Sequence, residues 1–361
     1  MPPNLYLTYK GTTLNDIYSL GRYVIFQELG DTRLIGVGSK QTVIESQFMW
    51  QCIINLSELA RRRPTLQKLR EYDENSSNPG TLQFLLDNNF IIKDTDLIST
   101  SRYNRSLYYY QSIGLSPEDV ETSLKKSRVT ILGCGGIGNH IGAALATNGI
   151  GTINLVDGDH IELSNLTRQI LFDENDIDAR KVDVLAKRLR ERNSHCRIHT
   201  FDTHINTIDD LKEIPESDII IVSADSSGIV NLVNIFCVEN KKTFINVGYM
   251  NDIAIWGPFV IPGETGCYAC GSLRIGLIGK DKNLNSNEDR LRKLNQDFKS
   301  ATFPPINATA SALATSDIIR YLAGSKSISS LNKRIGFHDL TLKLETQDFS
   351  INEECIVCQN R

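Results

Sequence analysis

The stretch VTILGCGGIG, residues 129–138, decides the fold, because an apolar run typical of a buried strand passes directly into a glycine-rich turn. Small residues follow in Ile141–Ala146, as expected of a helix that packs closely on a sheet. A second apolar run, Thr152–Val156, ends at Asp157, where a ribose-binding acid belongs. Strand, turn, helix and acid together predict a nucleotide site on a Rossmann-type βαβ unit.

The glycines of this turn have a physical role at a phosphate. They let the backbone turn tightly and approach the ligand, whose charge is favoured by the free N–H groups and the positive end of the following helix. We therefore expect these residues to bind the nucleotide: Gly133, Gly135, Gly136 and Gly138.

Strands and helices alternate after the turn, which predicts a doubly wound, mainly parallel sheet of the Rossmann-like α/β class. A later apolar stretch, Ile253–Ile261, is predicted as an antiparallel strand, and Thr309–Leu322 as an Ala-rich helix. Polar residues Gly279–Lys299 predict a loop or an exposed helix. The further predicted elements are strands Arg197–Phe201, Asp218–Ser223, Thr243–Val247 and Arg334–Thr346, and helices Lys181–Arg192 and Val230–Glu239.

The amino-terminal region has a different pattern. Two short β-type runs, Arg22–Glu28 and Arg33–Gly38, flank a hairpin signal, and Asn89–Lys93 is a further candidate strand. Helical spacing marks Val43–Arg62, Thr65–Tyr72 and Gly80–Asn88. We predict a small winged-helix-like α+β module over residues 1–98 and the nucleotide-binding domain over residues 99–361, with a crossover loop at about 271–305.

Composition sets outer limits on function. The chain has 361 residues, enough for roughly two domains. Its net charge is −4, with 40% hydrophobic and 23% charged residues, so nothing electrostatic favours nucleic-acid or membrane binding. Apolar runs are strand-sized, and no basic-then-apolar leader is visible, so the cytoplasm is the expected compartment.

The residues beyond Asp157 favour a triphosphate over NAD, the ligand that the glycine turn alone suggests. The run DGDHIELSNLTRQ, residues 157–169, supplies polar donors that hydride transfer does not need. Arg168 and Lys181 suit triphosphate oxygens and the charge that develops as pyrophosphate leaves, and the strand-end Asp225 suits Mg²⁺. The alternative for each is a solvated surface charge. Together they predict a nucleotidyl-transfer site.

GCGGIG, DGDHIELSNLTRQ, Lys181 and the SAD that ends at Asp225 together resemble the adenylating family of ubiquitin-activating enzymes and bacterial thiamin and molybdopterin activators. The resemblance covers about residue 102 to the carboxyl terminus. It implies that Asp157 binds ribose and Asp225 holds Mg²⁺. The implied nucleotide and phosphate contacts also include Asp159, Asn165, Arg168, Gln169 and Lys181.

The same resemblance implies a homodimer. RYNR, residues 102–105, matches the family's arginine motif, whose second arginine reaches into the active site of the other subunit. Here that residue is Arg105, and two shared catalytic sites are expected.

A closer resemblance is to peptide nucleotidyltransferases of the microcin C type. It rests on the amino-terminal module and on the blocks at Asn246–Pro258, Phe298–Asn307 and Ser330–Gly336. It implies ATP or CTP as donor and a short ribosomal peptide ending in Asn as acceptor. The terminal carboxylate is activated, the Asn amide closes a succinimide, and a second triphosphate gives an N–P bond, with the module clamping the peptide.

Two Cys-x-x-Cys pairs supply thiolates for a closed tetrahedral Zn²⁺ site. The alternatives are reduced cysteines packed by chance and a redox pair. Six scattered histidines, among them His160 and His338, show no metal spacing. The expected zinc ligands are Cys267, Cys270, Cys355 and Cys358.

A missing cysteine limits the chemistry. Thioester- or persulfide-forming relatives carry a nucleophilic cysteine on the crossover segment, whereas this chain has none between Gly271 and Glu354. The reaction is therefore predicted to end at nucleotidylation. The alternatives are adenylation of a Gly-Gly-terminated sulfur carrier, an NAD-dependent oxidoreductase, and a binding module that has lost catalysis.

Overall fold

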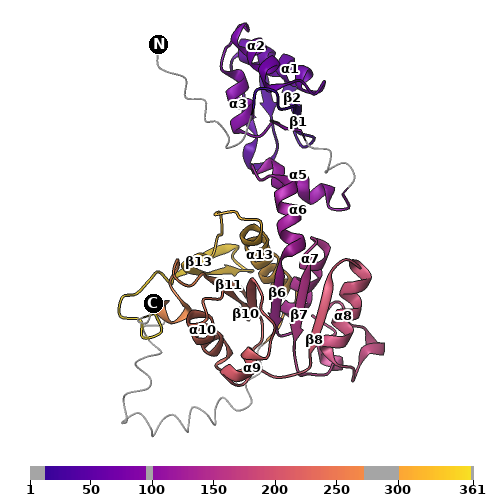
Figure 1. Ribbon diagram of the computed structural model, residues 1–361, viewed down its shortest axis with the longest axis vertical. Coiled ribbons are helices and arrows are strands. Elements are labelled where there is room, and N and C mark those ends of the chain that lie inside the picture. Colours follow the sequence, from indigo (N-terminus) through magenta and orange to yellow (C-terminus); the bar gives the residue numbers. More distant parts are fainter. Residues whose placement is uncertain (1–12, 95–100, 272–300, 359–361) are drawn as a thin grey trace. The chain divides into compact units, whose positions relative to one another are not determined.

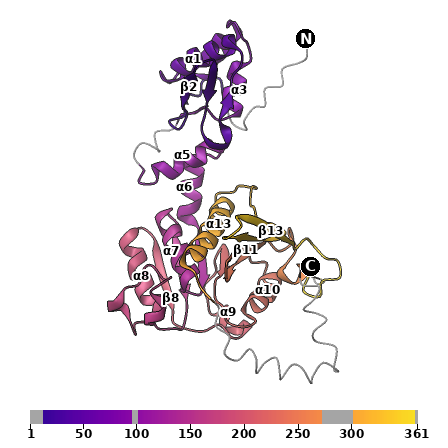
Figure 2. The same cartoon turned by 180° about the vertical axis from the view of Figure 1, so that it is seen from behind.

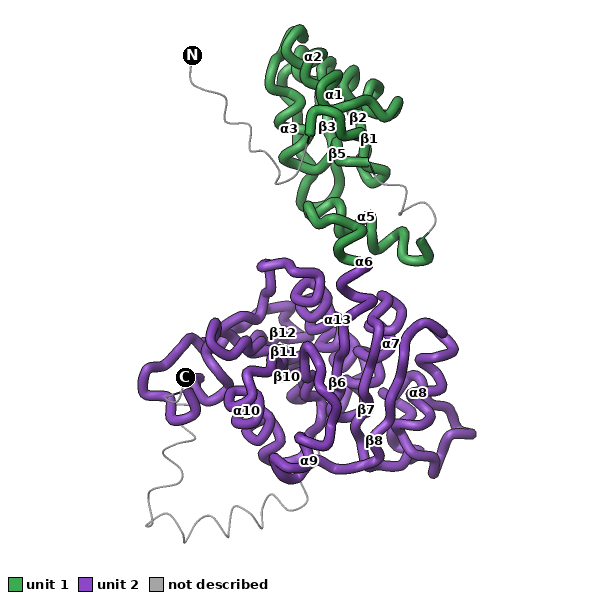
Figure 3. Tube along the Cα trace, viewed as in Figure 1, with its two compact units in different colours: residues 1–121 green, residues 122–361 purple. Residues whose placement is uncertain are grey.

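The computed structural model describes residues 13–94, 101–271 and 301–358 (Figure 1). The predicted polar loop Gly279–Lys299 lies outside these ranges. The chain divides into two compact units, Met1–Glu121 and Thr122–Arg361 (Figure 3). Among the helices that are described, none combines the length and apolar character that crossing a bilayer requires.

The first unit is a small α+β fold. β2 and β3 form the predicted hairpin, closed by Gly30 with a φ of +62°. A short strand that the sequence did not indicate, β1, pairs antiparallel with β5. The elements of this unit are β1 (Tyr18–Leu20), β2 (Phe26–Leu29), β3 (Thr32–Ile35), β4 (Thr42–Val43), α1 (Gln47–Ala60), α2 (Leu66–Glu74), α3 (Thr81–Asp87), β5 (Ile91–Lys93) and α5 (Asn104–Ser112).

The helix predicted over Val43–Arg62 was wrong at its start. Thr42–Val43 pairs with β3 as β4, and α1 begins only after Ser46, whose hydroxyl accepts a hydrogen bond from the backbone N–H of Met49. Such an N-cap satisfies a free donor of the first turn and fixes where the helix begins.

A single apolar core holds this unit together. Trp50, Ile53 and Leu56 of α1 lie buried against Ile35 of β3 and Leu85 of α3. Polar contacts tie the segment after residue 100 to the same unit, because the Lys40 ammonium donates to the backbone carbonyl of Ser112 at 2.6 Å. The compact division therefore falls after Glu121, and the domain boundary after residue 98 stays a prediction.

The second unit is the predicted α/β fold. α6 (Pro117–Lys126) crosses the division between the units. The strands are β6 (Arg128–Leu132), β7 (Thr152–Val156), β8 (Arg197–Phe201), β9 (Ile219–Val222), β10 (Phe244–Met250), β11 (Ile253–Val260), β12 (Lys333–His338) and β13 (Lys343–Asp348). The helices are α7 (Gly136–Thr147), α8 (Lys181–Arg192), α9 (Ile208–Lys212), α10 (Ile229–Glu239) and α13 (Pro304–Leu322).

The eight strands form one sheet in the order β13-β12-β11-β10-β9-β6-β7-β8. The run from β10 to β8 is parallel, and β11, β12 and β13 continue it antiparallel, as expected for Ile253–Ile261. Helices α8, α7 and α13 pack in succession over one face, and α9 and α10 cover the other (Figure 1 and Figure 2). The chain reverses its winding between β6 and β9, and ligands bind at such a switch point.

The single strand predicted over Arg334–Thr346 was wrong. The structure has a hairpin there, β12 and β13, whose turn is closed by a hydrogen bond from the backbone N–H of Leu342 to the carbonyl of His338. Leu342 has a φ of +55°, and no glycine marks the turn. The sequence therefore lacks the usual signal for it.

Candidate active site

A pocket of about 780 Å³ opens at the switch point, beyond the carboxyl ends of β6, β7 and β9. Nearly all the residues that the sequence assigned to the nucleotide line it: Gly133, Gly135, Gly136, Asp157, Asp159, Asn165, Arg168, Gln169, Lys181 and Asp225. Two assigned residues do not, Gly138 and Arg105.

Two positions of the turn after β6 require glycine, and the closer of the two contacts is at Gly138. Gly133 has a φ of +96°, and a Cβ there would lie 2.7 Å from the backbone nitrogen of Ala224. A Cβ at Gly138 would lie 1.9 Å from the carbonyl oxygen of Gly133. Gly138 thus allows α7 to pack against the turn and does not itself face the pocket.

Arg168 lies against the start of α7. Its Cγ and Cδ would lie 3.2 and 3.3 Å from a Cβ at Gly136, a tight contact, so the side chain packs closely on the bare backbone here. Its guanidinium donates to the backbone carbonyl of Ser164 at 3.1 Å. This places a cation beside the positive end of α7, where an anion is doubly favoured.

Two assigned amides are buried near this turn. The Asn165 side-chain oxygen accepts from the backbone N–H of Glu162, and Asn165 is only 6% exposed. Gln169 is 1% exposed, and its Oε1 has no hydrogen-bond partner in the described structure. A buried amide oxygen without a partner indicates a bound water or ligand at that position.

Asp157 holds the turn as well as lining the pocket. Its Oδ2 accepts from the backbone N–H of Cys134 at 2.6 Å, and its Oδ1 accepts from that of Asp159 at 2.9 Å. Burial raises the pKa of the Asp157 carboxyl, while Lys181 and the two N–H donors oppose the increase. A ribose hydroxyl would donate to the lone pairs that remain.

Lys181 begins α8 and is 7% exposed. Its ammonium lies 2.7 Å from Oδ2 of Asp159. The ammonium could exchange this ion pair for one with a phosphate at little cost, because the exposed Asp159 carboxylate would stay hydrated after losing its partner.

The charges of the pocket fit a metal-bound triphosphate. Arg168 and Lys181 are the lysine and arginine side chains that line it, against four carboxylates: Asp157, Asp159, Glu162 and Asp225. A triphosphate alone would meet this acidic balance unfavourably, whereas Mg²⁺ would offset it. Asp225 is exposed in the loop after β9 and lines the pocket, and its role as the Mg²⁺ ligand stays a prediction.

Arg105 is the second residue of α5 and belongs to the first compact unit. The pocket is lined only by residues of the second unit. The role of Arg105 at the site of a second subunit therefore stays a prediction.

The sequence did not indicate one side of this pocket. Residues 203–206, after β8, line it together with Ser223, Ile229 and Tyr249. Their residue types carry no motif. Their position after a parallel strand was the available signal, since the carboxyl ends of parallel strands meet at one edge.

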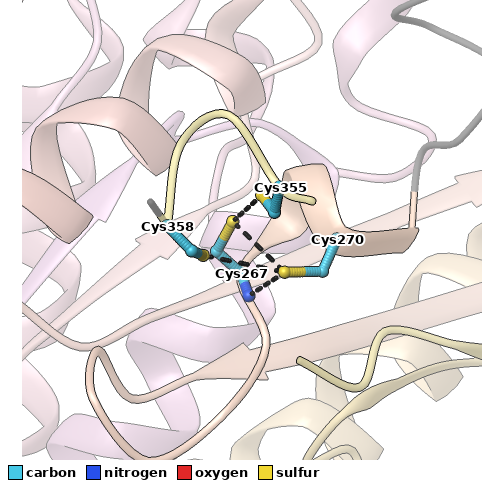
Figure 4. Close-up of side chains that lie close together, drawn as sticks. All are labelled: Cys267, Cys270, Cys355 and Cys358. Atoms are coloured by element: carbon cyan, nitrogen blue, oxygen red, sulfur yellow. Dashed lines mark hydrogen bonds between the residues drawn. The ribbon is translucent and has the colours of Figure 1, made fainter. Parts of the chain in front are cut away.

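The four cysteines of the Cys-x-x-Cys pairs converge, with their sulfurs within 4.8 Å of one another (Figure 4). Sulfur–sulfur distances are 3.7 Å for Cys267–Cys355 and 3.6 Å for Cys270–Cys358. A tetrahedral Zn²⁺ with Zn–S bonds of about 2.3 Å separates sulfurs by about 3.8 Å. The cluster therefore fits a structural zinc ion and fixes the tail to the segment after β11.

A buried residue that the sequence analysis missed supports this cluster. Asn234 of α10 is 1% exposed, and its amide donates to the Cys267 sulfur at 3.6 Å. The same amide accepts from the backbone N–H of Tyr268. Such outer contacts orient metal ligands.

The remaining four cysteines are buried: Cys52, Cys134, Cys196 and Cys237. Burial raises the pKa of the Cys196 and Cys237 thiols to about 12. It also raises that of Cys134. Thiols in this state are poor nucleophiles.

Known proteins match this architecture. The sequence model described as the ThiF family matches residues 103–357. The sulfur carrier protein ThiS adenylyltransferase of Escherichia coli (strain K12) is 33% identical over 156 residues, which are 42% of this chain and 61% of the relative. The chain spans less than two thirds of the length of the curated relatives it matches first.

Solved structures match over nearly the whole chain. Escherichia coli MccB with succinimide is 38% identical, with a TM-score of 0.87, over 96% of this chain and 100% of MccB. MccB with ATP is 38% identical, with a TM-score of 0.86, over 95% of this chain and 100% of MccB. The microcin C7 biosynthetic enzyme MccB with N-formylated MccA is 38% identical, with a TM-score of 0.87, over 95% of this chain and 99% of MccB.

Proposed function

This chain belongs to the ThiF family and is a nucleotidyltransferase, and we propose that it nucleotidylates the carboxyl-terminal asparagine of a short ribosomal peptide. The observation that carries the proposal is the match to MccB over 96% of this chain and 100% of MccB, the amino-terminal unit included. Solved MccB structures hold succinimide, ATP or the MccA peptide.

The proposed reaction has three steps. A terminal carboxylate oxygen attacks the α-phosphorus of a first nucleoside triphosphate, and pyrophosphate leaves. The asparagine amide nitrogen then attacks the acyl carbon, loses a proton and expels the nucleoside monophosphate, which closes a succinimide. The imide nitrogen loses its proton and attacks the α-phosphorus of a second triphosphate, which forms an N–P bond and releases pyrophosphate again.

The pocket supplies electrostatic stabilisation for both phosphoryl steps. The start of α7, Arg168 and Lys181 would bind the phosphates and stabilise the charge that develops on pyrophosphate. Asp157 would hold the ribose. Asp225 would hold Mg²⁺, which would supply positive charge to offset that of the phosphates.

The cysteines support a reaction that ends at nucleotidylation. The sequence has no cysteine between Gly271 and Glu354, and those outside the four-sulfur cluster are buried. Transfer of the activated acyl group to a thiol would need an exposed thiolate.

Two further parts complete the proposal. The amino-terminal unit clamps the peptide, and Arg105 of a second copy of the chain reaches each active site, so that the enzyme works as a homodimer. Zinc on the four-cysteine cluster is structural and takes no part in the reaction.

Pyrophosphate exchange separates this proposal from activation of a sulfur carrier. The full-length protein is incubated with Mg-ATP or Mg-CTP and labelled pyrophosphate, with either a short Asn-terminated peptide or a carrier protein ending in Gly-Gly. We expect exchange only with the peptide. Exchange stimulated by the carrier and not by any Asn-terminated peptide would reject the proposal.

A further inference from the structure

We propose that His204 contacts the nucleobase and makes the site prefer a purine to a pyrimidine triphosphate. The inference rests on the proposed use of a nucleoside triphosphate and extends it to the choice of base. Residues 203–206 form one wall of the pocket.

The order of the strands locates the base. β6, β7 and β8 are neighbours in the sheet, and each ends at the pocket edge. Phosphates on the turn after β6 and ribose on Asp157 after β7 direct the nucleotide along this edge. The next group, the base, therefore reaches the residues after β8, which are Thr203, His204, Ile205 and Asn206.

The imidazole of His204 presents an open ring to this end of the pocket. A Cβ built on Gly158 would lie 2.7 Å from Cδ2, 2.7 Å from Nε2 and 3.0 Å from Cε1 of the ring. Three nearly equal distances place that point over a face of the ring rather than at its edge. One face thus packs on the bare backbone of Gly158, and 63% of the side chain stays exposed.

Within the described part of the chain, no hydrogen bond holds the His204 ring away from a ligand. Its Nε2 lies 3.8 Å from Oδ1 of Asp159, beyond hydrogen-bond distance. Asp159 instead holds Lys181 through its other oxygen. The ring is therefore free to stack on a base.

The neighbouring side chains suit a flat aromatic ligand. Ile229, 4% exposed, and the partly buried Ile205 give apolar walls. Either kind of base can stack on the imidazole. A purine also extends past the imidazole onto these apolar side chains and buries more apolar surface, so adenine gains more affinity than cytosine.

Equilibrium binding tests the inference on the full-length protein, with Mg-ATP, Mg-CTP and inorganic Mg-tripolyphosphate as probes. We expect His204→Ala to weaken the binding of ATP about 10-fold. The binding of CTP should weaken less, and that of tripolyphosphate should not change. His204→Phe keeps a ring and should restore ATP affinity. His199→Ala is the matched control, because His199 is exposed on β8 and does not line the pocket.

The outcomes separate the inference from the proposed function. Unchanged ATP affinity in His204→Ala, an equal loss for tripolyphosphate, or an equal loss for CTP would each overturn the role of His204. A parent protein that binds ATP but not more tightly than CTP would overturn the purine preference. A parent protein that binds no triphosphate would contradict the proposed function itself and this inference with it.

Discussion

Lys181 shows how single charges set the chemistry of the pocket. It is nearly buried, and its ammonium faces Asp159 while it also opposes the raised pKa of Asp157. Under the proposed function, its loss would therefore remove a phosphate ligand and change the titration of Asp157, the proposed ribose ligand, at the same time.

We predict that Lys181→Met lowers kcat/KM for the triphosphate by about 100-fold, the usual effect of removing one preorganised donor from a transition state. If Asp157 binds ribose as the carboxylate, as proposed, nucleotide binding falls as pH drops through the raised pKa of Asp157. Without Lys181 that pKa rises further, and the fall moves to higher pH. Binding measured against pH checks this.

Lys187→Met provides the control, because Lys187 is exposed on the same helix and does not line the pocket. If triphosphate binding fell at the same acidic pH in Lys181→Met and in the parent, Lys181 would not act on the pKa of Asp157.

The site residues were predictable where a motif ties residue type to position. The glycine turn, Asp157, Arg168, Lys181 and Asp225 all lie at the pocket that their spacing suggested. His204 and Asn234 were missed, since each gains its meaning only from what packs beside it. A histidine after a strand or an asparagine in a helix has no distinctive pattern.

At the scale of elements, the closest approach in the turn between β6 and α7 is at Gly138. A Cβ at Gly138 would meet the carbonyl oxygen of Gly133 at 1.9 Å, so the turn or the helix must shift. We predict that Gly138→Ala lowers the free energy of unfolding by about 1–3 kcal/mol and abolishes measurable triphosphate binding.

Gly248→Ala is the matched control for this change, because a Cβ at Gly248 would have nothing within 4 Å. Denaturant unfolding and ATP binding are measured for both variants. If Gly138→Ala bound ATP as the parent does, the turn would not be the phosphate site.

The four-cysteine cluster joins two segments far apart in sequence. A structural Cys₄ zinc contributes on the order of 10 kcal/mol to the ordered state. We predict one zinc ion per chain, and we predict that Cys355→Ser loses it. The Tm should then fall by at least about 5 °C, the shift that a loss of about 2 kcal/mol produces in a unit of this size. Metal analysis and calorimetry measure both.

Cys52→Ser is the control, because Cys52 lies in the first unit and outside the cluster. We expect it to retain the metal. A Cys355→Ser protein with full zinc content would contradict the assignment of the ligands.

Elements were predictable where burial and helix signals coincide. β7 and α8 begin and end at the predicted residues, because a buried apolar run is followed by an amphipathic helix. β8 also has the predicted bounds, although Ile198 is its only fully buried residue. The β12–β13 hairpin was not, since every residue of β13 is exposed and the turn contains no glycine. Three-residue β1 has too few residues for periodicity to detect.

At the scale of the whole molecule, the proposal requires two copies of the chain. If Arg105 acts on the other subunit's pocket, Arg105→Ala and Lys181→Met are each inactive alone, yet a mixed dimer contains one intact site. Random exchange makes half of the dimers mixed, so we predict that an equal mixture regains about a quarter of the parent activity.

Sedimentation of the parent protein and activity of the mixture are the measurements. A monomeric active enzyme, or a mixture that stays inactive although subunits exchange, would place Arg105 outside the catalytic machinery.

The central claim is that the chain attaches a nucleotide to the asparagine end of a short peptide. The most direct test is the product mass after incubating the full-length protein with an Asn-terminated peptide and each Mg-NTP, with the same peptide ending in Asp as control. The account predicts an adduct of nucleoside monophosphate on the Asn peptide, two pyrophosphates released per product, and no stable adduct on the Asp peptide. No mass gain on any Asn-terminated peptide with any triphosphate would contradict it.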